Sequence, residues 1–482
     1  GLQQNFLEIQ KASAAVKGAG GGRGVQLERS SSLLSSSVDE KSRDSGGSGR
    51  LSGGSASASL VEKDAEIEQL QTELEAVKAA NEQDKEYIAQ MDGESMRKDE
   101  MLHSLQQQMK ASEDVRKRLH NQVMELKGNI RVFCRVRPFM DGDGKTGDKP
   151  SDMACLTSGD RPMVQICQQA AAGGRKRDLV TNEYMFDEVF MHDTTQEGIF
   201  KEIEPLLQSV MDGFRLCIFA YGQTGSGKTH TMQGSTERGC DDEQRGVVPR
   251  ALETIMHIRQ AMRKTGWEVS LEVSAMEIYN EVIRDLLTDS DDTSKKGLDI
   301  SADKTGEVVV RGLTVLEVQD EQAIYEVLES SAKRRQTAST CHNAVSSRSH
   351  SVVQLKVMMK HRKNKETRRG VLNLIDLAGS EKVTSQHDAT QFREAQNINK
   401  SLSSLLGVIQ ALASKSKHVP FRDSKLTHLL SSSLNGDGKA LMFANLSPRM
   451  GHVSETINTL RFAESVNKVQ LGTGKIKDKD AA

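Results

Sequence analysis

A seven-residue hydrophobic repeat runs from Leu60 to Leu126 without a change of register. Thirteen of its twenty a and d positions are apolar, over ten consecutive heptads. A pattern of this length and period predicts a left-handed α-helical coiled coil, because a lone helix would leave the apolar stripe in water. Asn81 at an a position favours two strands in register. We expect residues 59–127 to form a stalk that pairs with a second copy of the chain; the alternative is a single solvated helix.

The segments on either side of the repeat differ in composition. Residues 1–58 contain 11 Gly and 13 Ser, and such a segment buries too little apolar surface to offset the entropy of ordering. We therefore expect a disordered linker there. The chain begins with Gly rather than Met, so we also expect it to be part of a longer protein. All seven prolines and all six cysteines follow residue 133, which places the globular part of the chain after the repeat.

Residues 128–472 have the pattern of one large α/β domain. Short apolar runs rich in β-formers alternate with amphipathic helical stretches, which is typical of a central sheet flanked by helices. We expect a short polar tail over 473–482. A basic run at 360–369 lies between two strand-like segments and is interpreted as a solvated hairpin tip.

The overall composition excludes two classes of protein. The 65 basic and 67 acidic residues give a formal charge of −2, which excludes a uniformly basic nucleic-acid binder. The mean hydropathy is −0.52, and no apolar run approaches the ~20 residues that a membrane-spanning helix requires. The cysteines have no metal-ligand spacing and form no CxxC pair, so we expect reduced thiols.

A phosphate-binding motif, G-x-x-x-x-G-K-T, occupies residues 222–229. It follows an apolar strand-like run and precedes a helical stretch, which is the context that the motif requires. Backbone N–H groups of such a loop surround phosphate oxygens, the lysine reaches the β- and γ-phosphates, and the threonine hydroxyl binds Mg²⁺. We therefore expect ATP and Mg²⁺ as cofactors, held by Gly222, Gln223, Thr224, Gly225, Ser226, Gly227, Lys228 and Thr229.

Four sequence blocks, in order, resemble those of kinesin motor domains. They are FAYGQTGSGKTHTM at 219–232, NAVSSRSH at 343–350, DLAGSE at 376–381, and NINKSL at 397–402 followed by HVPFRDSKLT at 418–427. The sequence LHNQVMELKGNIRVFCRVRP at 119–138 is similar to the neck–motor junction of the C-terminal-motor class, kinesin-14. The resemblance implies an α/β fold of the P-loop NTPase type, with a mixed, mostly parallel central sheet flanked by helices.

The resemblance also implies roles for individual residues. Ser346 and Ser347 would carry the first switch to Mg²⁺ and the γ-phosphate. Asp376 would support the metal through water, and Gly379 would donate its N–H to the γ-phosphate. Arg348 and Glu381 would close as an ion pair when the γ-phosphate holds both switches.

Three further sets of residues follow from the same resemblance. Arg135, Pro138 and His230 would pack around adenine, and Gly128 with Asn129 would form the pivot of the neck. The cations that would face the acidic surface of tubulin are Lys415, Lys417, His418, Arg422 and Lys425.

The function expected from these features is ATP-driven, minus-end-directed movement along microtubules, in the cytoplasm or on the spindle. We expect no nucleic-acid partner and no membrane insertion. The alternative is a non-motile microtubule crosslinker with a vestigial ATPase. A metabolic phosphotransferase is disfavoured, because nothing resembles a lid for an acceptor substrate and the long stalk would have no role.

Overall fold

The structure is a computed structural model. It describes residues 56–144, 147–158, 161–169, 179–235, 242–288, 298–303, 307–341, 347–363, 365–381, 389–435 and 438–469. Ser346, most of the expected linker and the expected polar tail lie outside these ranges. The chain divides into two units, residues 1–103 and 104–482, and each is described by itself.

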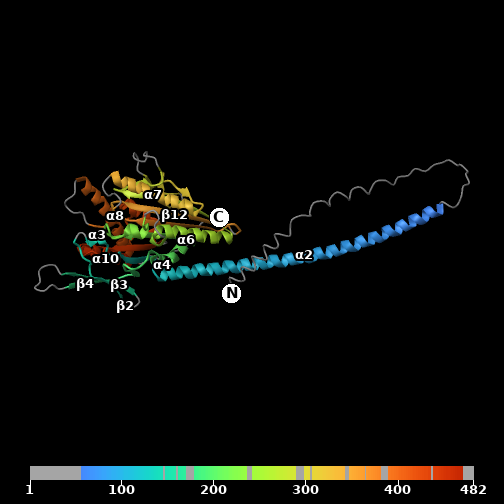
Figure 1. The fold of residues 1–482 in the computed structure, drawn as a ribbon, viewed down its shortest axis with the longest axis horizontal. Coiled ribbons are helices and arrows are strands. Elements are labelled where there is room, and N and C mark those ends of the chain that lie inside the picture. The colour runs from blue at the N-terminus through green and yellow to red at the C-terminus, as the bar shows by residue number, and fades with distance from the viewer. Residues whose placement is uncertain are drawn as a thin grey trace. The chain divides into compact units, whose positions relative to one another are not determined.

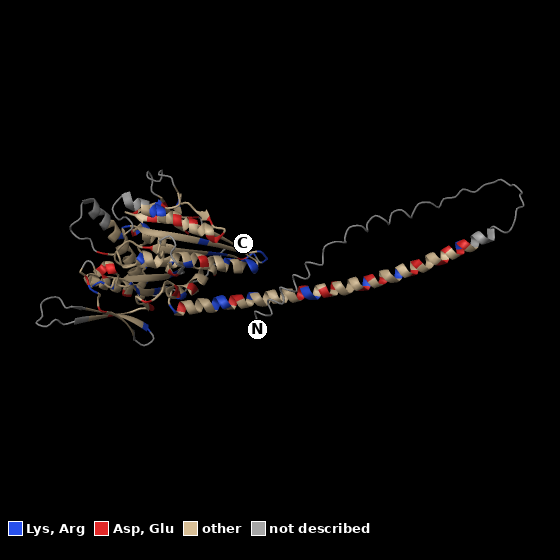
Figure 2. Ribbon diagram, in the orientation of Figure 1, with Lys and Arg blue, Asp and Glu red and all other residues tan. Residues whose placement is uncertain are grey.

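Ala56–Leu126 form one continuous helix, α2, of 71 residues. Acidic and basic side chains are interspersed along it (Figure 2), and its apolar a and d side chains lie exposed, as Ile67 at 52% and Leu74 at 53% show. The helix is followed by Gly128, whose φ of 94° is left-handed and whose N–H donates to the Glu125 carbonyl at 3.1 Å. This is a common way for a helix to end, because glycine adopts the left-handed region without steric cost.

A nine-stranded mixed sheet forms the centre of the second unit (Figure 1). Its main path runs β11-β7-β12-β13-β6-β14-β1-β5, with β8 paired to β7. The half from β13 through β6, β14 and β1 to β5 is parallel, and the other half is antiparallel. The strands are β1 (Ile130–Val136), β5 (Glu188–Phe190), β6 (Arg215–Tyr221), β7 (Trp267–Tyr279), β8 (Val282–Asp285), β11 (Leu316–Glu317), β12 (His350–His361), β13 (Thr367–Asp376) and β14 (Gly438–Leu446).

Helices cover both faces of the sheet, and alternate strand residues divide between two apolar cores. In β1, Val132 and Cys134 join one core and Phe133 the other. The first core is completed by α8 (Ala389–Ala413), α9 (Lys425–Leu434) and α10 (Val453–Asn467), and the second by α4 (Gln196–Met211), α6 (Val247–Lys264) and α7 (Glu321–Cys341). The expected central sheet flanked by helices is confirmed.

Smaller elements complete the unit. Strands β2 (Met153–Ser158), β3 (Arg161–Gln169) and β4 (Leu179–Met185) form an antiparallel sheet, and β9 (Asp299–Ala302) pairs with β10 (Val308–Arg311). The short helices are α3 (Asp141–Gly144) and α5 (Lys228–Met232). Within the described ranges, no helix combines the length and apolarity needed to cross a bilayer.

The C-terminal turns of α2 belong to the second unit and pack against the rest of it. Met124 is 4% exposed and belongs to the core that contains α4. Arg116 forms an ion pair with Asp212 at 2.7 Å, and the His120 ring lies 3.1 Å from the Ser209 hydroxyl. The side chain of Leu119, which occupies a d position of the repeat, is 55% exposed. Docking on the domain therefore leaves apolar positions of the heptad stripe open to a second helix.

Candidate nucleotide site

The phosphate loop connects β6 to α5 and depends on three glycines with positive φ. Gly222, Gly225 and Gly227 have φ of 148°, 78° and 95°, angles that other residues adopt only with strain. A Cβ at Gly222 would collide with the Asn445 carbonyl of β14. The neighbouring strand therefore approaches so closely that only glycine fits at the start of the loop.

Lys228 bonds within the loop, and Thr229 links the loop to the end of β13. The Lys228 ammonium donates to the carbonyls of Gly222 and Gln223, each at 2.9 Å. Its burial lowers the pKa of the amine, and the carboxylates of Asp376 and Glu381 act in the opposite direction. Thr229 Oγ1 donates to Asp376 Oδ2 at 2.8 Å.

Arg335, on α7, also reaches the site. Its guanidinium donates to Asp376 Oδ2 at 2.9 Å, and both side chains are almost completely buried. The charge-assisted hydrogen bond between them offsets part of the cost of burying two charges. Asp376 thus holds the loop threonine and the helix α7 together.

The segment after β13 bonds to two other parts of the site. Gly379 donates its N–H to the Ser347 carbonyl at 2.8 Å, and Ser380 donates to the Gly222 carbonyl at 3.1 Å. The Glu381 carboxylate accepts from the backbone N–H of Thr224 at 2.8 Å and from its hydroxyl. In this structure Glu381 is joined to the phosphate loop, so its closure on Arg348 stays a prediction for the ATP-bound state.

The expected base pocket divides into an interior and an exposed part. Pro138 and His230 are exposed. Arg135 is 9% exposed and donates to Gln196 at 2.9 Å and to Thr231 at 3.0 Å, and burial lowers its pKa to about 10. The guanidinium of Arg135 therefore holds α5 through Thr231. Contact of Arg135 with adenine stays a prediction.

The donor set of the site fits a nucleotide with Mg²⁺. Asp376 Oδ1, Gln223 Oε1 and Ser226 Oγ are buried and have no hydrogen-bond partner among the described residues. Buried polar atoms of this kind normally have a partner. Carboxylate and hydroxyl oxygens are ligands that Mg²⁺ prefers, and hydrogen-bonding groups in a glycine-rich loop suit phosphate. No cluster of three or more His, Cys, Asp or Glu side chains suited to a metal occurs in the described ranges.

The residues expected to face tubulin lie after α8. Lys415, Lys417, His418 and Arg422 are exposed. Lys425 is the exception, since its ammonium pairs with Asp299 at 2.5 Å and is 34% exposed. Four of the five cations are thus exposed and accessible to a partner.

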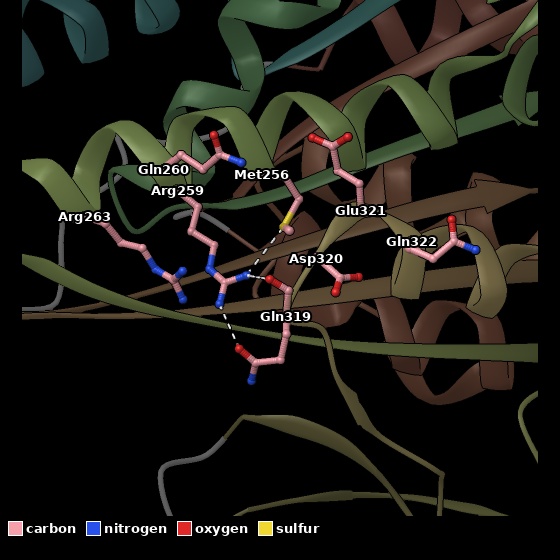
Figure 3. Close-up of a pocket in the computed structure, with 8 residues that line it drawn as sticks. All are labelled: Met256, Arg259, Gln260, Arg263, Gln319, Asp320, Glu321 and Gln322. Carbon is pink, nitrogen blue, oxygen red and sulfur yellow. Dashed lines mark hydrogen bonds between the residues drawn. The ribbon is translucent and has the colours of Figure 1, made fainter.

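A pocket of about 370 Å³ lies elsewhere, between α6 and the segment that leads into α7 (Figure 3). Arg259 spans it and donates to the carbonyls of Val269, Val318 and Gln319 at 3.0–3.1 Å. This buried arginine satisfies backbone carbonyls near the start of β7 and directly after β11. We therefore interpret the pocket as structural.

Sequence motifs did not reveal two of the site residues, Arg335 and Arg137. Arg137 donates to the Gly225 carbonyl at 2.6 Å and pairs with Asp143. A signal for Arg335 was present, because it falls four residues after Ser331 and eight after Val327, on the buried face of α7. A charged residue on an otherwise buried helix face indicates a partner inside the fold.

Comparisons with known proteins agree with this geometry. The kinesin motor domain family matches residues 135–469. The chain is 43% identical over 388 residues to the kinesin-like protein KIN-14C of Arabidopsis thaliana, covering 77% of this chain and 47% of that protein. It is 37% identical over 480 residues to the mouse kinesin-like protein KIFC1, covering 95% of this chain and 66% of that protein. The chain thus spans about half the length of several curated relatives.

Solved structures give the same result. The C-terminal motor and motor homology domain of Kar3Vik1, fused to a synthetic heterodimeric coiled coil, matches with a TM-score of 0.68 and 34% identity, covering 85% of this chain and 99% of that one. The motor domain of the Saccharomyces cerevisiae kinesin-related protein Kar3 matches with a TM-score of 0.61 and 38% identity, covering 70% and 100%. The family match covers more than half of the chain, and its similar relatives include KIN-14 and Kar3 proteins, so the chain belongs to the kinesin motor family, in the kinesin-14 class.

Proposed function

We propose that this chain is an ATP-driven motor that moves toward the minus end of microtubules. The observation that carries the proposal is the set of hydrogen bonds by which two separate segments meet at the phosphate loop. Glu381 accepts from Thr224, and Gly379 donates to Ser347. A γ-phosphate that accepts the Gly379 N–H competes with the Ser347 carbonyl, so its arrival and loss change the contacts between these segments.

The site residues divide the work of hydrolysis. Lys228 and the loop N–H groups position the phosphates, and Thr229, Ser347 and, through water, Asp376 would hold Mg²⁺. When bound, Mg²⁺ neutralises charge on the β- and γ-phosphates. Release of Glu381 from Thr224 would free its carboxylate to pair with Arg348, which orders the attacking water.

The surroundings of the site support a microtubule partner and a lever. Lys415, Lys417, His418 and Arg422 are exposed cations that would meet the acidic surface of tubulin, with an affinity that falls as salt rises. The helix α2 ends at Leu126, and only Lys127 separates it from the Gly128–Asn129 pivot. Rotation of α2 about this pivot would be the working stroke. We propose a homodimer that works on microtubules of the cytoplasm or the spindle.

The test compares the ATPase rate of the full chain with and without microtubules, and then filament gliding on polarity-marked microtubules. We expect stimulation by microtubules and minus-end-directed movement. Lys228→Ala should abolish turnover while the fold is kept, whereas Lys201→Ala, at an exposed lysine of α4, should leave it unchanged. Microtubule bundling without stimulated ATPase would instead support the passive crosslinker.

A further inference from the structure

His350, at the start of β12, lies buried between the nucleotide site and helix α8. Its side chain is 3% exposed. Ring atom Nδ1 accepts from the backbone N–H of Ala378 at 3.0 Å, and Nε2 lies 2.8 Å from the Ser401 hydroxyl. A backbone N–H can only donate, so the ring proton resides on Nε2 and Ser401 Oγ accepts it. The Ser401 hydroxyl donates in turn to the Ile398 carbonyl at 2.7 Å.

The two partners of His350 belong to segments with different roles. Ala378 directly precedes Gly379, whose N–H donates to the carbonyl of Ser347, three residues before His350. The hydrogen bonds from Ala378 to His350 and from Gly379 to Ser347 thus join the segment 378–379 to the segment 347–350. Ser401 lies on α8, which leads to the exposed basic loop at Lys415 and Lys417.

The neighbouring residue fixes the frame in which the imidazole sits. The Ser349 hydroxyl donates to the buried carboxylate of Glu277 on β7 at 2.6 Å. Ser349 and Glu277 are both fully buried. The backbone at His350 is therefore anchored to the sheet. If the segment 378–379 moves, the imidazole must move with it, and this displaces the hydrogen bond to Ser401 on α8.

We propose that His350 is a positioning residue that transmits the arrangement of the nucleotide-site segments to α8 through Ser401. The proposal rests on the proposed function, because α8 leads to the basic loop at Lys415 and Lys417 that we propose to contact the microtubule. A buried ring with both nitrogens bonded has one well-defined orientation. Loss of the bond to Ser401 uncouples α8 from the site without removing any group that contacts nucleotide.

Three substitutions in the full chain separate the two bonds. In His350→Asn the amide oxygen can replace Nδ1 as the acceptor for Ala378, but the side chain is too short to reach Ser401. In His350→Gln the amide nitrogen can replace Nε2 as the donor to Ser401, but the Nδ1 acceptor is lost. Ser401→Ala removes the bond from the α8 side. The matched control is Ser403→Ala on the same helix, an exposed hydroxyl that bonds to its own helix at the Asn399 carbonyl.

The expected readout is a split between kinetic parameters. For Ser401→Ala and His350→Asn we expect the basal ATPase to stay within about twofold of wild type. The kcat at saturating microtubules should fall about tenfold, with little change in the microtubule KM, because the exposed cations are intact. The double substitution should be no worse than His350→Asn alone, since both remove the same bond. His350→Gln, which retains the bond to Ser401, should recover part of the stimulation.

A second measurement does not depend on turnover. Hydrogen exchange of α8 amides is compared between the ADP-bound chain and the chain bound to a non-hydrolysable ATP analogue. We expect a nucleotide-dependent difference in wild type and in Ser403→Ala that is lost in Ser401→Ala. If His350→Asn fails to fold, Ser401→Ala alone decides.

Wild-type stimulation in Ser401→Ala together with an unchanged exchange difference would overturn the inference and leave the motor function intact. An equal loss in Ser403→Ala would also overturn it. Absence of microtubule stimulation in the wild-type chain would contradict the proposed function instead, and the exchange experiment would still test the link through His350.

Discussion

Gly379 combines two restrictions at one residue. Its N–H is bonded to Ser347, and a Cβ placed there would collide with the Glu381 carboxylate and the Thr224 hydroxyl. An alanine must therefore displace the Glu381 carboxylate and the Thr224 hydroxyl, and so disturb the hydrogen bonds that join Glu381 to the phosphate loop.

We predict that Gly379→Ala lowers the ATPase rate at least tenfold while the chain stays folded. The measurement is steady-state turnover, with thermal unfolding to verify the fold. Gly407→Ala on α8 is the control, because nothing lies within 4 Å of its Cβ position and alanine favours a helix over glycine by roughly 0.5–1 kcal/mol. That variant should melt slightly higher, and a similar loss of turnover in it would contradict the steric argument.

The buried imidazole of His350 predicts a pH dependence of stability. Burial lowers the pKa of His350 to about 3; Arg335 and Lys228 act in the same direction and Asp376 in the opposite one. The unfolded chain, with a histidine pKa of about 6.5, binds one more proton between these two values. The contribution to stability is therefore complete above pH 6.5 and is lost as the pH falls, by up to about 1.4 kcal/mol per pH unit.

Denaturant unfolding of wild type and His350→Asn at pH 7 and pH 5 measures this contribution. The free energy of unfolding of wild type should fall by about 2 kcal/mol more than that of the variant over this interval. Equal losses would show that His350 does not supply the proton uptake. Groups that titrate equally in wild type and in His350→Asn contribute equally to both losses, so their effect cancels when one loss is subtracted from the other.

Sequence motifs predicted the loop and switch residues because each motif is a local stretch of backbone. Gly222, Lys228 and Thr229 are close in space for the same reason that they are close in sequence. The partners of Arg335 and His350 depend on where α7 and α8 pack against the sheet. No single stretch of sequence contains that information.

At the scale of elements, the heptad period predicted a helix over residues 60–126. In the structure α2 runs without a break from Ala56 to Leu126. The period could not predict that the last turns dock on α4, since Arg116 and His120 find Asp212 and Ser209 some ninety residues away. Burial of Met124 adds an apolar contact to these polar ones. The neck is therefore held by its own domain up to the glycine that ends it.

We predict that replacing Gly128 and Asn129 together by alanine slows gliding or reverses its polarity while most of the ATPase is kept. The left-handed φ of 94° strains any other residue at Gly128, at a cost of roughly 1–2 kcal/mol. An alanine pair favours continuation of the helix and so redirects the lever. Gly93→Ala, in open space within α2, is the matched control and should glide normally; unchanged gliding in the double variant would remove the pivot from residues 128–129.

At the scale of the molecule, charge should govern the encounter with the polymer. Neutralising Lys415 and Lys417 should weaken microtubule affinity and flatten its dependence on salt, because fewer cations then meet the acidic surface. Co-sedimentation at several ionic strengths measures both effects. Lys425→Ala tests the ion pair with Asp299 and should change the salt dependence less; an unaltered affinity in the double variant at low salt would place the interface elsewhere.

The exposed apolar stripe of α2 predicts the oligomeric state. Leu70, Leu105 and Leu119 are 45–59% exposed, and such a stripe is stable in water only when a second helix covers it. Of the residues that dock the neck, Arg116 occupies an a position, whereas Met124 and His120 lie outside the a and d positions. Docking therefore leaves the apolar a and d residues Leu119 and Val123 available for pairing. Sedimentation of the full chain should give a dimer at micromolar concentration.

Two shortened chains separate pairing from docking. A chain that starts at Ser104 keeps the docked turns but only about three heptads, and we expect it to be a monomer with a melting temperature close to that of the full chain. A chain that starts at Arg131 also loses Met124 from the core, so it should be a monomer that melts lower, because removal of a buried methionine side chain costs roughly 2–5 kcal/mol. A monomeric full chain would show that the polar residues of the stripe, Asp84 and Lys98 among them, prevent self-pairing. A different partner chain would then have to cover the stripe.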